Sequence, residues 1–296
     1  METRMSETRD WQCFEIATDD HGIAHITLNR PEKRNAMIRA FWDELPEAIR
    51  MLDKSGEVRV IVISSTGPHF TAGIDLTGFA DMTGNLGAGE SDIHREANRG
   101  LDFYAMAKRM QDAFTALESA RVPVVAAIQG GCIGGGVDMV SACDMRFCTE
   151  DAYFTVYEIN IGMTADVGTF PRLLNLLPEG IVRELSYTGR KMGAEEAARY
   201  GLANKVYTDH AAMMDGVMEM AREIATKAPM AVHGIKNIIT HARDHKTAET
   251  LDYIALWNAS MLKQSEVMTA MMAKQSGEPG KFAPLPPLKK VSGEEE

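Results

Sequence analysis

The chain has 296 residues, of which 31 are Lys or Arg and 42 are Asp or Glu, so its net formal charge is −11. With 45% hydrophobic and 25% charged residues it has a globular composition, and it lacks the apolar run of about 18 residues that a membrane span requires. The basic residues are dispersed, which argues against phosphate-backbone binding. We therefore expect neither nucleic acid nor a membrane among its partners.

The four cysteines, Cys13, Cys132, Cys143 and Cys148, stand in apolar sequence and form no CxxC pair. This pattern predicts reduced, buried thiols rather than disulfides or a zinc site.

The start of the chain mixes acidic and basic residues without an apolar core, and its end reads VSGEEE. Since neither resembles a targeting segment, we expect the protein to act in the cytoplasm.

In the first half of the chain, short apolar runs rich in β-branched residues alternate with helical patterns, which is typical of an α/β fold. The expected strands are at 12–29 (a hairpin that turns at 19–22), 58–64 and 122–128, and the expected helices at 36–52, 101–119 and 139–145. The polar, glycine-rich stretch 81–100 is long for a loop, so we interpret it as mobile or as a lid.

From about residue 194 helical patterns dominate, near 195–200, 210–227, 229–243 and 247–274. The change places a boundary near residue 208, between a catalytic core (1–208) and a C-terminal helical domain (209–275). The last segment, 276–296, has four prolines and charged ends, which predicts an extended, unpacked tail.

Two glycine-containing segments follow the expected strands. In Phe70–Asp75 the backbone N–H groups could face a ligand, although the segment taken by itself favours an ordinary strand-to-helix turn. The segment Gly130–Asp138 has five glycines in its first seven residues, between a strand and a helix. Such a turn offers free N–H donors at a helix start, and it contains neither GxGxxG nor a P-loop pattern. A purely structural turn is the alternative.

Three acidic residues, Asp138, Glu158 and Asp166, stand in apolar or glycine-containing sequence. Each alone could be a helix cap or an ion-pair partner. Together they are candidates for general acid and base groups, because buried carboxyls have perturbed pKa values.

Four motifs together resemble the crotonase (enoyl-CoA hydratase/isomerase) superfamily in order and spacing, over roughly residues 12–275. They are LNRPEKRNA from Leu28, FTAGIDL from Phe70, GGCIGGGVDM from Gly130 and EINIGMTADVGTFPRL from Glu158. The three acids, with the later segments that begin at Leu251 and Trp257, most resemble the Δ3,5-Δ2,4-dienoyl-CoA isomerases of that superfamily.

The resemblance implies an α/β fold, a spiral of ββα turns with a C-terminal helical trimerisation domain, assembled as a homotrimer or a homohexamer. It also implies an acyl-CoA substrate, with the N–H groups of Ala72 and Gly135 as the oxyanion hole. The residues implied to bind substrate or CoA are Asn35, Ala36, Met37, Thr71, Gly73, Ile74, Asp75 and Gly136.

The implied reaction removes a proton from C2 of a 3,5-dienoyl thioester and returns one at C6. Two N–H donors would stabilise the charge on the thioester oxygen. Glu158 is the expected base at C2 and Asp166 the expected acid at C6, although the two roles could be reversed. Asp138 would tune Glu158, and these groups would titrate as a coupled set. No metal or redox cofactor is expected.

The same family resemblance leaves two alternative functions, a hydratase and a protein without catalytic activity. An enoyl-CoA hydratase would use glutamates at positions 138 and 158, but the first is an aspartate here, and position 166 is usually glycine in hydratases. A catalytically silent scaffold or RNA-binding relative would be expected to lack the acids and to have a basic face, and the chain has neither feature.

Overall fold

The computed structural model describes residues 10–77 and 93–289, with the backbone alone for 93–99. Its main sheet has six strands in the order β1-β2-β3-β4-β6-β9. The strands are β1 (Phe14–Thr18), β2 (Ile23–Leu28), β3 (Val60–Ser65), β4 (Val124–Ile128), β6 (Met145–Thr149) and β9 (Lys205–Tyr207). The β1–β2 pair is antiparallel and all other pairs are parallel. The expected hairpin and the two buried strands are thus confirmed within one or two residues.

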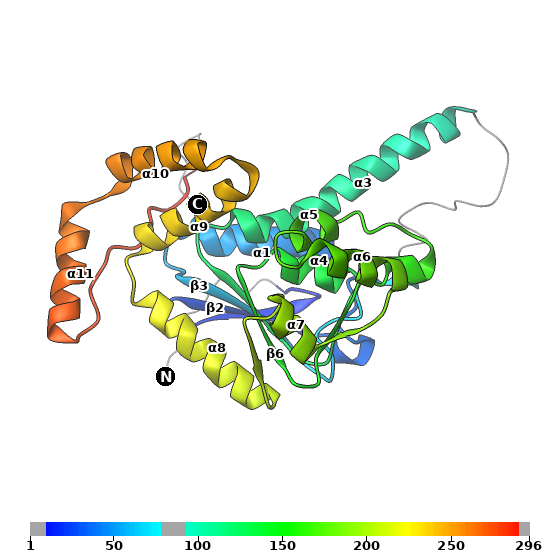
Figure 1. The fold of residues 1–296 in the computed structure, drawn as a ribbon, viewed down its shortest axis with the longest axis horizontal. Helices are drawn as coiled ribbons and strands as arrows, with labels where there is room; N and C mark the ends of the chain where they lie inside the picture. Colours follow the sequence, from blue (N-terminus) through cyan, green and yellow to red (C-terminus); the bar gives the residue numbers. More distant parts are fainter. Residues whose placement is uncertain (1–9, 78–92, 290–296) are drawn as a thin grey trace.

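Alternate residues of these strands enter two separate apolar cores, because successive side chains of a strand point to opposite faces. On one face Val60 and Val62 of β3 pack with residues of α8 (His210–Ala225), including Val217. On the other face Ile61 and Ile63 join a larger core. That core includes side chains of α1 (Phe41–Lys54) and α3 (Ile93–Ser119), so the sheet lies between helices (Figure 1).

A small second sheet joins β5 (Gly131–Ile133), β7 (Tyr153–Thr155) and β8 (Met192–Gly193). A parallel bridge between Thr71 and Cys132 connects it to the segment after β3, and a second bridge pairs Met37 with Ile74. Three separate parts of the chain are therefore held side by side at the carboxyl ends of β3 and β4.

Several helices begin or end away from the predicted positions. Helix α1 begins at Phe41 rather than 36, because Arg34 and Asn35 adopt left-handed φ values and Met37 pairs with Ile74. Helix α3 begins at Ile93, so residues 93–100 of the expected loop are helical, and the part at 78–92 lies outside the described residues. The helix expected at 139–145 lies four residues earlier, as α4 (Gly135–Ser141). Its expected last residue, Met145, is instead the first residue of β6.

The remaining helices are η1 (Pro31–Lys33), η2 (Glu158–Ile161), α5 (Thr169–Leu173), α6 (Glu179–Thr188), α7 (Ala194–Tyr200), α9 (Pro229–Asp244), α10 (Thr247–Met261) and α11 (Gln264–Ser276). The helix expected at 247–274 is therefore two helices, separated at residues 262–263. Helices α10 and α11 extend away from the sheet (Figure 1).

The C-terminal segment returns to the core. Residues 279–289 have no helix or strand, as expected of an extended tail. The prediction that the tail is unpacked is wrong, because Leu285 is buried in the larger core and the Leu288 N–H donates to the Lys54 carbonyl at the end of α1. Helix α8 packs on the sheet, while the functional division at residue 208 stays a prediction.

All four cysteines are free and buried, in agreement with the sequence. Among the residues that the structure describes, no helix is both long and apolar enough to cross a membrane.

Candidate active site

The glycine turn between β4 and α4 is buried and leaves backbone donors at the start of α4. Gly134, the residue before the helix, has a φ of 51° that favours glycine. A Cβ there would lie 3.2 Å from the Glu158 Oε1 atom, so the missing side chain lets this carboxylate approach the turn. All seven residues of α4 are buried, which fixes the position of its first N–H groups.

The segment 71–75 lies against this turn and is bonded along one side to the loop before α1. The Ala72 N–H donates to the Arg34 carbonyl at 2.8 Å, and the Asp75 N–H to the Met37 carbonyl at 3.0 Å. In return, the Met37 N–H donates to the Gly73 carbonyl at 2.8 Å. The Ala72 donor assigned to the oxyanion hole is therefore already used within the fold.

Ile74 and Gly135 have free N–H groups and also line the cavity described below. Within the described part of the chain, neither N–H donates a hydrogen bond to the protein. The two nitrogens lie close together, since the Ile74 nitrogen is 3.9 Å from the point where a Cβ of residue 135 would stand. The geometry therefore favours Ile74, rather than the predicted Ala72, as the second candidate donor beside Gly135.

These donors border a cavity of about 280 Å³. Ala72, Ile74, Gly134 and Gly135 form one wall, and Glu158 and Asp166 are also among the lining residues. The rest of the lining is mainly apolar. Leu76 and Ile133 belong to it, and the other residues come from α3 and from the region of η2: Phe103, Met106, Ala107, Met110, Tyr157, Ile161, Met163 and Val167. The sequence analysis missed the α3 residues, although their spacing of three and four residues marks one helix face.

The three acids come from different elements. Asp138 is on α4, Glu158 begins η2, and Asp166 lies in the loop before α5. Glu158 and Asp166 face the cavity, whereas Asp138 is 1% exposed and is not among the residues that line it. The Thr169 hydroxyl donates to Asp138 Oδ1 at 2.7 Å. The structure therefore brings the acids together with unequal access to a ligand.

Burial raises the pKa of all three carboxyls. It raises the pKa of Asp138 to about 7, with a further contribution from the charge of Glu158, while the hydrogen bonds of Thr169 act in the opposite direction. The pKa of Glu158 is raised by burial and, to a smaller extent, by the charge of Asp166. Burial also raises the pKa of Asp166. A raised pKa favours the protonated form of a carboxyl, which can donate a proton, while the ionised form can accept one.

Most of the residues predicted to bind substrate or CoA lie in or beside the two bonded segments. Asn35 and Thr71 are buried, and their side chains bond to the protein backbone. Met37, Gly73 and Gly136 are buried, while Ala36, Ile74 and Asp75 are partly exposed. Asn35, Thr71 and Met37 therefore shape the site from behind, and Ile74 borders the cavity directly.

Comparison with known proteins agrees with this geometry. Residues 18–275 match the model of a protein family described as enoyl-CoA hydratase/isomerase. The chain belongs to this family. The mitochondrial Δ(3,5)-Δ(2,4)-dienoyl-CoA isomerase of Rattus norvegicus is 42% identical over 89% of this chain and 80% of its own length. The peroxisomal enzyme of the same name from Arabidopsis thaliana is 37% identical over 90% of this chain and 94% of its own.

The family fold is also seen in solved structures. The enoyl-CoA hydratase of Bacillus anthracis matches with a TM-score of 0.80 and 25% identity, over 92% of this chain and 99% of its own. The resemblance inferred from the motifs, to the superfamily and to its dienoyl-CoA isomerases, is thus confirmed. The described residues contain no cluster of three or more His, Cys, Asp or Glu arranged to hold a metal ion.

Replacing Thr169 by Val should raise the pKa of Asp138, because the variant keeps the side-chain shape but removes the hydroxyl that donates to the carboxylate. A hydrogen bond to a charged group contributes about 1.5–3 kcal/mol, so the titration midpoint should rise by roughly one pH unit or more. Infrared titration of the protonated carboxyl band measures the midpoint. Ser141→Ala is the matched control, because that hydroxyl donates to the Asp138 backbone carbonyl instead. An unchanged or lower midpoint in Thr169→Val would contradict this account of Asp138.

Proposed function

We propose that the protein converts 3,5-dienoyl-CoA to 2,4-dienoyl-CoA in fatty-acid β-oxidation. Relatives with this activity in their names are 37–42% identical over most of the chain. The observation that carries the proposal is the placement of Glu158 and Asp166 in one apolar cavity with two unused N–H donors. A dienoyl thioester needs these groups, because a proton leaves at one carbon and returns four carbons away.

The N–H groups of Ile74 and Gly135 would bind the thioester oxygen. Deprotonation at C2 moves negative charge onto this oxygen, and donors that are already in place stabilise the charge without reorganisation. Both nitrogens belong to backbone that is bonded on its other side or buried in α4. The energetic cost of orienting them is therefore met during folding rather than in the reaction.

Glu158 is suited to remove the C2 proton because its carboxylate lies next to the donors. Its Oε1 atom is 3.2 Å from the Cβ position of residue 134, immediately before the Gly135 donor. Its Oε2 atom is buried and has no hydrogen-bond partner among the described residues. An unpaired oxygen in an apolar cavity is available to a proton from C2, which is adjacent to the thioester carbon.

Asp166 would return a proton at C6. It lines the same cavity, and burial raises its pKa, which favours the protonated form that can donate. In one turnover Glu158 gains a proton and Asp166 loses one. Glu158 must then release its proton to solvent and Asp166 must take one up before the next turnover, so the complete cycle consumes no proton. Asp138, buried beside Thr169, would act through its charge on Glu158 rather than by contact with the substrate.

The hydratase alternative requires two acids that reach one water molecule, at positions 138 and 158. Asp138 does not line the cavity, and its Oδ1 atom is occupied by Thr169. The geometry therefore favours the pair Glu158 and Asp166 over the pair that hydration would use. The presence of all three acids also disfavours a silent scaffold.

The CoA nucleotide is proposed to lie along the backbone of Asn35–Met37. This loop leads directly to the donor segment through the Met37–Ile74 bridge, and Lys33 and Arg34 before it are exposed and basic. Such side chains can bind the phosphates of CoA. The carboxyl-terminal side of the loop would then direct the pantetheine arm toward the cavity.

A homotrimer or homohexamer is proposed from the exposed apolar residues of the C-terminal helices. They are Ile235, Ile239, Leu251, Leu256, Met261, Leu262, Val267, Met268, Met271 and Met272. Apolar residues gathered on extended helices are typical of an interface between subunits. The cytoplasmic location stays a prediction, and the two dienoyl-CoA isomerases named above are mitochondrial and peroxisomal.

The purified protein should convert a 3,5-dienoyl-CoA to the conjugated 2,4-dienoyl product faster than it hydrates a 2-enoyl-CoA. Absorbance of the conjugated thioester follows the first reaction and loss of the 2-enoyl absorbance follows the second. EDTA should leave the isomerisation rate unchanged, because the thioester, the N–H donors and the carboxylates supply the chemistry. Faster hydration would overturn the proposed function. A loss of isomerisation rate that a divalent ion restores would show that the expectation of a metal-free reaction is wrong.

The Glu158→Gln variant should lose exchange of the C2 proton with solvent while CoA-ester binding remains close to wild type. The amide keeps the shape of the side chain but cannot accept the proton, and such groups contribute about 100- to 10,000-fold in rate. Hydrogen–deuterium exchange of a bound substrate, measured by mass spectrometry, tests this directly. Exchange at the wild-type rate would assign the base role to another acid.

The Asp166→Asn variant should keep C2 exchange and lose isomerisation, because the donors and Glu158 still form the dienolate. In deuterated buffer the variant should return labelled 3,5-diene, whereas the wild type should place label at C6 of the 2,4-diene. NMR of the recovered acyl chain distinguishes the two positions. If exchange and isomerisation disappear together, Asp166 acts at C2 or in folding, and the proposed division of roles is wrong.

A further inference from the structure

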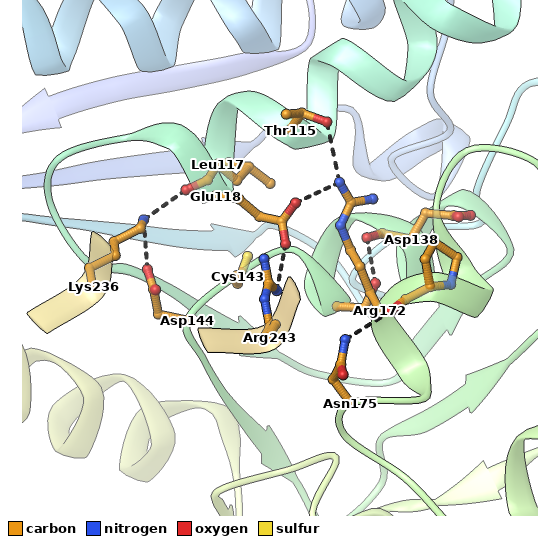
Figure 2. A network of polar contacts seen from close by, with 12 residues as sticks. Thr115, Leu117, Glu118, Asp138, Cys143, Asp144, Arg172, Asn175, Lys236 and Arg243 are labelled. Atoms are coloured by element: carbon orange, nitrogen blue, oxygen red, sulfur yellow. Dashed lines mark hydrogen bonds and ion pairs between the residues drawn. The ribbon is translucent and has the colours of Figure 1, made fainter. Parts of the chain in front are cut away.

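A set of charged side chains connects helix α9 to the segment that contains Asp166. Glu118, near the end of α3, accepts hydrogen bonds from Arg172 of α5 and Arg243 of α9, each at 2.8 Å. Figure 2 shows Glu118 between the two guanidinium groups, with Asp138 on the other side of Arg172. One carboxylate thereby joins three helices next to the site.

The pair of Glu118 and Arg172 is shielded from solvent. Their side chains are 15% and 10% exposed, and Arg243 is 30% exposed. Burial acts to raise the pKa of Glu118, but the hydrogen bonds and charges of the two arginines outweigh it and lower the pKa. Glu118 therefore stays ionised, and its removal would leave a buried arginine without its charged partner.

Arg172 reaches back to the loop in which Asp166 lies. Its Nη1 atom donates to the Val167 carbonyl at 3.4 Å, and a Cβ on Gly168 would lie 1.9 Å from the same nitrogen. Only a glycine at position 168, with its φ of 131°, leaves room for the guanidinium. On the other side, Gln111 Nε2 donates to the Asp166 carbonyl at 2.7 Å.

The same loop separates two cavities. Asp166 and Val167 line the apolar cavity of the site and also a second, more polar cavity of about 400 Å³. Glu118, Arg172 and Arg243 line only the second of these two. The three charged residues thus lie on the outer side of the loop that bears Asp166. They do not face the cavity proposed for the acyl chain.

We propose that Arg172 is a positioning residue for Asp166, held in place by Glu118 and, through it, by Arg243 of α9. This inference rests on the proposed function, in which Asp166 protonates C6. The position of the proton donor at C6 depends on the loop that bears Asp166. Behind this loop lies the second, polar cavity, and Arg172 is the side chain that supports the loop from there. The geometry at C2 depends on Glu158 and the two N–H donors. Among the described residues, these groups form no hydrogen bond with Glu118, Arg172 or Arg243.

The test is the ratio of C2 exchange to isomerisation in the Glu118→Gln variant. The amide keeps the size of the side chain but removes the charge that holds Arg172. Isomerisation should fall about 10- to 100-fold, as expected for a small displacement of a reacting group, while C2 exchange stays near the wild-type rate. A general loss of folded structure would lower both rates together, and thermal unfolding measured in parallel identifies that case.

Two further variants strengthen the test. Gly168→Ala displaces the guanidinium and, because residue 168 has a φ of 131°, also strains the loop that bears Asp166, without changing any charge. It should therefore change the ratio in the same direction. Glu196→Gln is the control, because it removes one of the two carboxylate partners of Arg190, bonded at 2.7 and 2.8 Å, and neither residue lines either cavity. This control should leave both rates unchanged.

A ratio that stays at the wild-type value in both Glu118→Gln and Gly168→Ala would overturn the positioning role, and so would an equal loss of both rates in variants that unfold at the wild-type temperature. The Asp166→Asn variant separates this failure from a failure of the proposed function. If Asp166→Asn changes the ratio and Glu118→Gln does not, only the positioning role is wrong. If Asp166→Asn does not change it either, the role of Asp166 itself is wrong.

Discussion

The site depends on a seam of backbone hydrogen bonds between three segments that are distant in the sequence. The loop before α1 bonds to one side of residues 71–75, and Thr71 pairs with Cys132 of β5 on the other. Because these bonds use the donors of Ala72 and Asp75, the remaining donor at Ile74 faces the cavity beside Gly135. The free Ile74 donor thus depends on an interruption of strand geometry: Gly73 has a φ of 81°, and Ala72 and Asp75, three residues apart, both donate to the loop before α1.

Asn35 holds this seam in place. Its backbone has a left-handed φ of 52°, which is uncommon for a residue other than glycine. Its side chain compensates for the conformation with three hydrogen bonds: it accepts one from the Arg30 N–H and donates to the carbonyls of Thr66 and His69. A buried amide of this kind fixes one backbone arrangement, because any other would leave polar groups unpaired. The constraint explains why α1 begins later than its apolar spacing predicts.

Around the seam, carboxyl groups are placed in apolar surroundings and supported from behind. Burial raises the pKa values of Asp138, Glu158 and Asp166, which favours their protonated forms over those of ordinary surface carboxyls. The cost of keeping them there is offset by polar contacts outside the cavity. Thr169 bonds Asp138, and the arginine of the same short helix is fixed by Glu118. Helix α5 therefore joins the electrostatics of the site to the packing of α3 and α9.

The sequence was sufficient to place the main strands of the sheet, the glycine turn and the three acids. β3 and β4 are continuous apolar runs that are buried on both faces, as is typical of parallel strands covered by helices, whereas β1 shows the period-two pattern of a strand buried on one face. The family motifs then identified the chemistry, because glycine runs and acids at fixed spacing are required by it. The same patterns failed at Met37, whose apolar side chain fits a helix period but belongs to a bridge with Ile74.

Tertiary structure alone decided which N–H is free, which acid meets the cavity and what stands behind Asp166. Ala72 and Ile74 differ by two residues, and only the partner strand shows which of their donors is used. Asp138 and Asp166 look alike in sequence, yet one is enclosed by α4 and α5 while the other faces the cavity. Glu118 and Arg243 are 125 positions apart, and no local pattern predicts their contact. Local propensity and periodicity are properties of neighbouring residues, whereas the pairing of donors, charges and cavities depends on contacts between segments that the chain brings together only when folded.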